Sequence, residues 1–153
     1  MPEITWERTA PPPDEQLIES VQQDLGVQLP GDFLASVRES DGGRPSSHVL
    51  DFGRRLEAVF IRRLSFYDEG VHSREPGIVE TYDAIKDRLP PDVVPFGRDP
   101  FGNIYCFDYR NQTEKGPKVV FWDHEGADPE SPDASLTHVC DSFTDLLGML
   151  YDI

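Results

Sequence analysis

The segment 103–109 is apolar on both of its predicted faces, and this pattern constrains the fold more than any other feature of the sequence. Successive side chains of a strand point to opposite sides, so one face carries Ile104 and Cys106 and the other carries Tyr105, Phe107 and Tyr109. A strand with apolar side chains on both faces is typical of the interior of a sheet. We therefore expect residues 103–109 to form a central strand.

A second strand is expected to return beside the first. Lys118–Trp122 is rich in β-forming residues. The polar segment 110–117, with its Gly-Pro step, predicts a hairpin loop of eight residues. Further strand patterns occur at 49–52, 57–67, 92–97 and 136–140.

Four segments have the apolar spacing of helices. The first begins at Asp14, and its apolar residues repeat on one helical face until Gly26, which suits a left-handed helix stop. The others are expected at 31–40, 78–89 and 142–151, the last capped by Asp141 or Ser142. Three consecutive prolines predict an extended arm over residues 1–13. No linker divides residues 14–153, which we expect to form a single domain.

The charge balance excludes several classes of partner. Fourteen Lys and Arg against 29 Asp and Glu give a net charge of −15. Nucleic acid and anionic membranes would repel such a chain, and we expect neither as a partner. The sequence has no long apolar run and no signal-peptide pattern, and its two cysteines do not form a disulfide framework. A cytoplasmic protein is therefore expected.

The acidic residues are concentrated near both ends of the chain. Residues 119–153 hold eight acids and no Lys or Arg, and residues 14–41 hold seven acids against Arg38 alone. A small basic cluster lies between these regions, formed by Arg54, Arg55, Arg62 and Arg63. The acidic segment 123–133 follows the returning strand and is the densest run of negative charge.

No catalytic motif is recognisable, and we expect neither an enzyme nor a cofactor. The Asp123-His124-Glu125 triplet follows a strand and has the residue types of a metal or acid–base site. Neighbouring residues of an extended chain point apart, so a polar turn is the simpler interpretation. The wider acidic loop lacks the glycine and the final glutamate of a calcium loop. His138 and Cys140 would share a strand face, too far apart to form a catalytic pair.

Several short motifs, taken in order, resemble the SUKH superfamily, the group of the fungal Smi/Knr cell-wall assembly regulator. The matching residues lie between positions 14 and 151, and the most informative are Leu29, Pro30, Phe33, Gly42, Gly43, Pro95, Gly97, Gly102 and Asn103. These are turn-forming and core residues, so we interpret them as determinants of the fold. The resemblance implies an α+β fold, in which an N-terminal helix pair and a C-terminal helix pack against an antiparallel or mixed sheet of five to six strands.

The resemblance also implies a binding function. Bacterial members are mostly immunity proteins that neutralise a toxin, and fungal members are regulatory scaffolds. Our leading hypothesis is an immunity protein whose cognate toxin has a basic surface, such as a nuclease. A regulatory scaffold is the alternative, and a hydrolase at the Asp123 triplet is the third. The expected contact residues are Asp123, Glu125, Asp128, Glu130 and Asp133, with Asp41 and Asp51 as weaker candidates.

Overall fold

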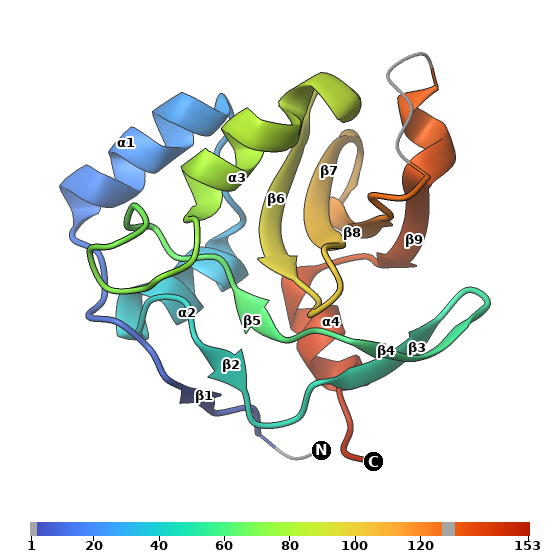
Figure 1. Ribbon diagram of the computed structural model, residues 1–153, viewed down its shortest axis with the longest axis horizontal. Helices are drawn as coiled ribbons and strands as arrows, with labels where there is room; N and C mark the ends of the chain where they lie inside the picture. Colours follow the sequence, from blue (N-terminus) through green and yellow to red (C-terminus); the bar gives the residue numbers. More distant parts are fainter. Residues whose placement is uncertain (1–2, 127–130) are drawn as a thin grey trace.

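The computed structural model describes residues 3–126 and 131–153 (Figure 1). Its helices are α1 (Glu15–Leu25), α2 (Gly31–Glu39), α3 (Ile78–Ile85) and α4 (Phe143–Met149), with 3-10 turns η1 (Lys86–Arg88) and η2 (Pro132–Ser135). None of the helices in the described ranges is long and apolar enough to cross a membrane.

A five-stranded antiparallel sheet forms the centre of the molecule. Its strands, in spatial order, are β5 (Arg62–Arg63), β6 (Val93–Arg98), β7 (Ile104–Thr113), β8 (Gly116–Trp122) and β9 (Leu136–Cys140). Two smaller antiparallel pairs flank it, namely β1 (Trp6–Glu7) with β2 (Arg44–Pro45), and β3 (Val49–Phe52) with β4 (Arg55–Val59). The expected α+β class is confirmed. Of the expected alternatives, an antiparallel or mixed sheet of five to six strands, the central sheet is antiparallel with five strands, and β7 is its central strand.

The two faces of β7 contribute to two different hydrophobic clusters, as the alternation predicts. Tyr105 and Phe107 belong to the larger cluster, and Ile104 and Cys106 to a smaller one beneath the end of α3. Phe33 of α2 lies at the centre of the larger cluster. Its ring makes edge contacts with the rings of Phe96, Phe107 and Phe143, at centroid distances of 5.6, 5.3 and 5.1 Å. Truncating such a ring to alanine typically costs about 3–5 kcal/mol.

The helices begin and end where local chemistry directs. The Asp14 carboxylate accepts a hydrogen bond from the Leu17 amide (2.8 Å) and caps α1. Gly26 ends that helix with φ of 75°, in the left-handed region that glycine tolerates best. Ser142, one of the two expected caps, accepts from the Asp145 amide and starts α4.

Two expected segments differ from the structure. Residues 57–67 do not form one strand, because the chain leaves the β3–β4 pair after Val59 and joins the central sheet at Arg62. The Phe60 amide donates to His48 and the Ile61 amide to Arg98, so consecutive residues bond to different sheets. Residues 110–117 are not a loop of eight residues, because β7 continues to Thr113 and β8 starts at Gly116.

The N-terminal segment packs against the rest of the chain. Trp6 of β1 pairs with Pro45 of β2, and Ala10 forms an isolated bridge with Asp41. The Trp6 ring stacks against Phe143 of α4, with 6.4 Å between centroids. Glycine at position 43 permits the close approach of β1, because a Cβ atom there would lie 2.7 Å from the Glu7 carbonyl oxygen.

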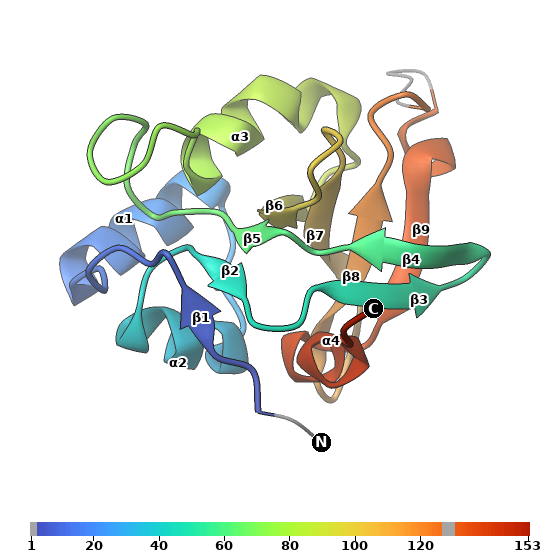
Figure 2. The same ribbon diagram turned by 60° about the horizontal axis from the view of Figure 1, so that its bottom comes forward.

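The β3–β4 hairpin lies across the Tyr105 face of the sheet (Figure 2). The ring of Phe52 contacts Phe121 of β8 and Tyr105 of β7, at centroid distances of 5.3 and 6.3 Å.

On the same side of the sheet, α2 packs beside α4, and the Asp32 carboxylate accepts hydrogen bonds from the Thr144 amide and hydroxyl (both 2.9 Å). The two acidic ends of the chain therefore meet in space.

Candidate functional site

The described part of the segment 123–133 lies beyond the end of β8 and leads into η2 and β9. Asp123 is half-buried, and its amide donates to the Ser135 carbonyl (2.9 Å), which holds the two ends of the segment together. Glu125 and Asp133 are exposed. Asp128 and Glu130 lie outside the described residues.

Two of these acids form ion pairs with arginines. The Asp123 carboxylate lies 2.9 Å from the Arg55 guanidinium, and that guanidinium also covers the Phe121 ring at 4.5 Å from its centroid. Asp133 lies 2.6 Å from Arg110, which also pairs with Asp108. Asp108 and Asp133 in turn raise the pKa of Arg110, so this guanidinium stays charged.

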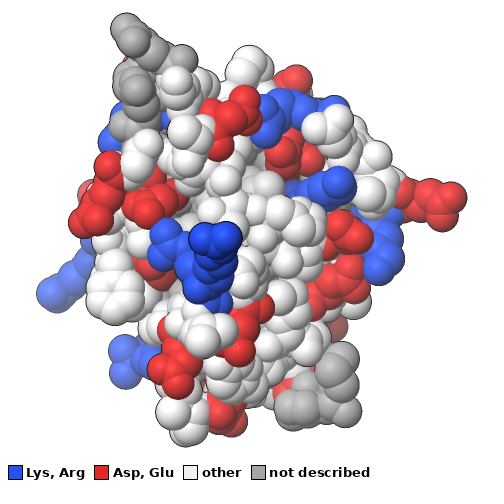
Figure 3. Space-filling view, turned by 90° about the vertical axis from the view of Figure 1, so that its right-hand side faces the viewer, with Lys and Arg blue, Asp and Glu red and all other residues white. Residues whose placement is uncertain are grey.

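Basic and acidic side chains are interspersed on the side of the molecule that contains β9 and the tip of the β3–β4 hairpin (Figure 3). Figure 3 shows the side formed by β9 and the tip of the β3–β4 hairpin, where Lys and Arg lie beside Asp and Glu around an uncharged area. The negative charge of the chain does not form one continuous field on this face.

The Asp123-His124-Glu125 triplet does not converge on a common point. Asp123 turns to Arg55, whereas the His124 ring lies 2.7 Å, Nδ1 to Oδ1, from the side chain of Asn103. Asn103 is anchored by Asp99, which accepts from both its amide and its side-chain nitrogen at 2.8 Å. Glu125 points to solvent. Across residues 3–126 and 131–153, no three His, Cys, Asp or Glu side chains are grouped as metal ligands.

Asp41 is not available to a partner, and the expectation that it contributes to binding is wrong. Its side chain is fully buried, and it accepts hydrogen bonds from the Ser65 hydroxyl and the Phe66 amide. Burial raises the pKa of the Asp41 carboxyl, while those two hydrogen bonds and nearby Arg63 oppose the shift. Asp41 therefore has a structural role, because its buried carboxylate joins the segment between α2 and β2 to Ser65 and Phe66.

Asp51 is exposed at the β3–β4 hairpin, but it has a structural role as well. Its carboxylate accepts from the Glu57 amide and from the Tyr151 hydroxyl, both at 2.8 Å. These two hydrogen bonds lower the pKa of Asp51. The residue thereby ties the hairpin to the C-terminal segment.

His138 and Cys140 do not share a strand face, contrary to expectation. A register shift between their β8 partners, Val120 and Val119, turns the His138 side chain to solvent and the Cys140 side chain inward. His138 lies 3.6 Å from Asp141. Burial raises the pKa of Cys140 to about 12, so its thiol is not a nucleophile at neutral pH.

An apolar groove that was not predicted from the sequence includes Arg55, the ion-pair partner of Asp123. Leu56 and Phe101 are the most exposed large apolar side chains of the described region apart from Ile153, with 76% and 71% of their surfaces accessible. Both line a cavity of about 210 Å³ between β4 and the turn that precedes β7, which we call the hairpin groove; its lining is completed by Arg55, Glu57, Ala58, Val59, Asp99, Asn103 and Phe121. The available signal was an apolar residue among charged or polar neighbours in each of two segments, Leu56 in β4 and Phe101 in the turn before β7.

Comparisons with known proteins identify relatives of this chain. Residues 12–149 match the model of the SMI1 / KNR4 family (SUKH-1). The chain is also similar to the SPbeta prophage-derived uncharacterized protein YokK of Bacillus subtilis (strain 168), with 28% identity over 156 residues, covering 91% of this chain and 74% of that protein. The matched range agrees with the interval 14–151 that carries the sequence resemblance.

Proposed function

This chain belongs to the SMI1 / KNR4 family (SUKH-1), and from that premise we propose that it is an immunity protein that binds and neutralises one cognate protein toxin. The family supports this class of function, because the resemblance implies immunity proteins among its bacterial members. The observation that carries the proposal is the hairpin groove, an exposed apolar cavity bordered by charged residues.

The groove has the composition of a protein-binding surface. Such interfaces combine an apolar centre with a polar rim, and a few large apolar or aromatic side chains supply most of the affinity. Leu56 and Phe101 would form the centre, Arg55 and Glu57 are charged residues of the lining, and Asp123 pairs with Arg55. The alternation of charges around the groove would select a partner with a matching pattern.

The net charge of −15 adds a kinetic advantage against a cationic toxin. Electrostatic complementarity raises association rates above the roughly 10⁵–10⁶ M⁻¹s⁻¹ typical of neutral pairs, and salt suppresses the gain. In this proposal, the overall charge accelerates the encounter and the groove stabilises the complex. Occupying the cationic surface of a nuclease would then exclude its substrate.

The proposal is tested by titrating the protein with the toxin encoded beside its gene. We expect a stoichiometric complex and loss of toxin activity. Replacing Leu56 and Phe101 by Asp removes the apolar centre of the proposed contact and should weaken binding by at least tenfold, which corresponds to about 1.4 kcal/mol. Val71→Asp is the matched control, because Val71 is also exposed (58%) and lies outside the groove.

Two results would overturn the proposal. One is the absence of any complex with the neighbouring toxin. The other is an equal loss of affinity in the groove variants and in the Val71 control. Specific binding of an endogenous regulatory protein in place of a toxin would favour the scaffold alternative, and the groove variants would then map its contact surface.

A further inference from the structure

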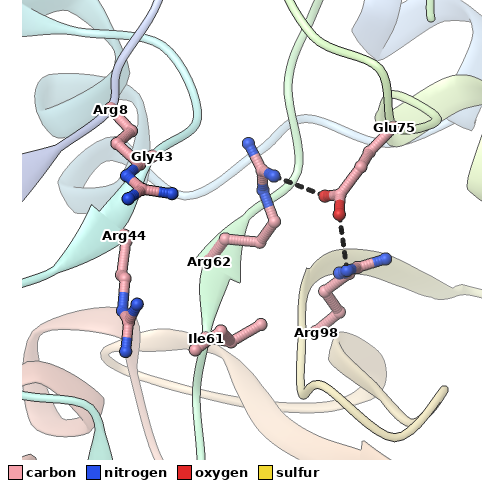
Figure 4. A pocket seen from close by; sticks show the side chains of 7 residues that line it. All are labelled: Arg8, Gly43, Arg44, Ile61, Arg62, Glu75 and Arg98. Atoms are coloured by element: carbon pink, nitrogen blue, oxygen red, sulfur yellow. Dashed lines mark hydrogen bonds and ion pairs between the residues drawn. The ribbon is translucent and has the colours of Figure 1, made fainter.

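Four arginines from distant parts of the sequence line one small pocket. Arg8 follows β1, Arg44 lies in β2, Arg62 in β5 and Arg98 at the end of β6 (Figure 4). The pocket has a volume of about 130 Å³. Such convergence is unexpected in a chain that carries 14 basic residues against 29 acidic ones.

Glu75 is the one carboxylate among the side chains that line this pocket. Glu75 lies between two of them and pairs with both Arg62 and Arg98, the latter at 2.7 Å (Figure 4). Within the described residues, neither Arg8 nor Arg44 has a carboxylate within 4.0 Å. The lining therefore has an excess of three positive charges, obtained from four arginines and one glutamate.

The arrangement is held by the fold. Arg62 and Arg98 are direct partners in the β5–β6 ladder, so their side chains share one face of the sheet. Like charges placed opposite each other are destabilising, and Glu75 lies between these two arginines and pairs with both. The Nε atom of Arg98 is buried and has no hydrogen-bond partner among the described residues. Arg8 holds a left-handed backbone conformation with φ of 55°, which is uncommon for a residue other than glycine.

An anion bound in the pocket would offset this excess of positive charge. Guanidinium groups present planar arrays of N–H donors that match the oxygens of phosphate and carboxylate groups. A carboxylate would neutralise one of the three surplus charges, whereas a phosphate dianion would neutralise two. The pocket volume of about 130 Å³ leaves room for a phosphate group.

We propose that the pocket lined by Arg8, Arg44, Arg62 and Arg98 binds a phosphate dianion, either free inorganic phosphate or the phosphate group of a small monoester. The site is independent of the proposed toxin contact, because it shares no lining residue with the hairpin groove. Phosphate bound there would join the N-terminal segment to β2, β5 and β6. Binding would therefore stabilise the folded protein by mass action.

The test measures binding and thermal stability of the full chain with inorganic phosphate, with glycerol phosphate as the monoester, and with sulfate, acetate and chloride, all at constant ionic strength. We expect saturable binding of phosphate or the monoester with Kd below about 1 mM, and a higher melting temperature. A preference between the two identifies the source of the ligand. Acetate and chloride should give neither effect, and equal effects of all five anions would overturn the proposal.

Three variants make the test specific. The double variant R8Q/R44Q removes the two arginines that have no ion pair with any described residue, so it should fold normally and lose at least tenfold in phosphate affinity. E75Q removes the carboxylate that repels the anion and occupies Arg62 and Arg98, so it should bind phosphate more tightly. R54Q, in an exposed arginine outside the pocket, is the control and should bind as the wild type does. Phosphate affinity unchanged in R8Q/R44Q, or reduced equally in R54Q, would refute the site.

Discussion

The indole ring of Trp6 covers the guanidinium group of Arg63, with 3.9 Å between the guanidinium carbon and the ring centroid. Arg63 is fully buried, and its three nitrogens donate to the Gly42 carbonyl and to the Ser36 and Ser40 hydroxyls. Desolvation lowers the pKa of Arg63 to about 10, and the hydrogen bonds and the aromatic ring replace the lost water. The N-terminal segment thus closes a buried cationic centre between α2 and β5.

Trp6→Ala should destabilise the protein by about 3 kcal/mol, because it removes the ring from both Arg63 and Phe143. Trp6→Phe retains an aromatic face and should recover about half of the loss. Urea unfolding followed by far-ultraviolet circular dichroism measures both effects. A change below about 0.5 kcal/mol in Trp6→Ala, the range of ordinary surface substitutions, would show that the N-terminal segment contributes little to stability.

Asp41 should make stability depend on pH in a defined direction. Because burial raises the pKa of Asp41 in the folded state, folding favours its protonated form. Its contribution is therefore largest below its ordinary value of 3.8 and is lost as the pH rises through the higher folded-state value. Asn does not titrate at position 41, so a comparison of Asp41→Asn with the wild type removes the pH dependence that all other titrating groups contribute to both proteins.

The free-energy difference between wild type and Asp41→Asn should accordingly shift in favour of the wild type as the pH falls from 7 to 4. Denaturant unfolding at several pH values measures this difference. A difference that is constant with pH, or that shifts in favour of Asp41→Asn on acidification, would contradict the raised pKa.

Charge reversal in the acidic segment should slow association with the toxin. The double variant D128K/D133K changes the charge of the segment 123–133 by four units, whereas E19K/D24K makes the same change on α1. We expect the first to slow association several-fold more than the second at low salt, with the gap narrowing as salt screens the charges. Stopped-flow kinetics at two ionic strengths provide the measurement. Equal effects of the two variants would indicate that only the net charge matters.

Gly43→Ala should be more costly than Gly116→Ala, although both glycines have positive φ, 87° and 97°. The left-handed conformation alone costs about 1–2 kcal/mol for alanine. At Gly116 the added Cβ meets open space, whereas at Gly43 it would lie 2.7 Å from the Glu7 carbonyl oxygen. Chemical denaturation of both variants isolates the contribution of this close approach, and equal losses would show that the N-terminal segment moves away without cost.

Local patterns were sufficient to predict much of the fold. The alternation in residues 103–109 identified the central strand and correctly divided its two faces, because neighbouring side chains must point to opposite sides of any strand. Gly26 and Ser142 marked helix ends, because their preferences depend on the backbone within a few residues. The family resemblance drew on the same local signals.

Only the tertiary structure decided which side chains are buried and which form a groove or a pocket, because these features depend on contacts between residues far apart in the sequence. Nothing near Asp41 in the sequence indicates that Ser65 and Phe66 bury it, and residues 57–67 have uniform strand character although they divide between two sheets. The apolar side chains of Leu56 and Phe101 become a groove only when β4 folds against the turn before β7. Arg8, Arg44, Arg62 and Arg98 form a pocket only through pairing of their strands, and pairing across long loops is set by the free energy of the whole packed chain.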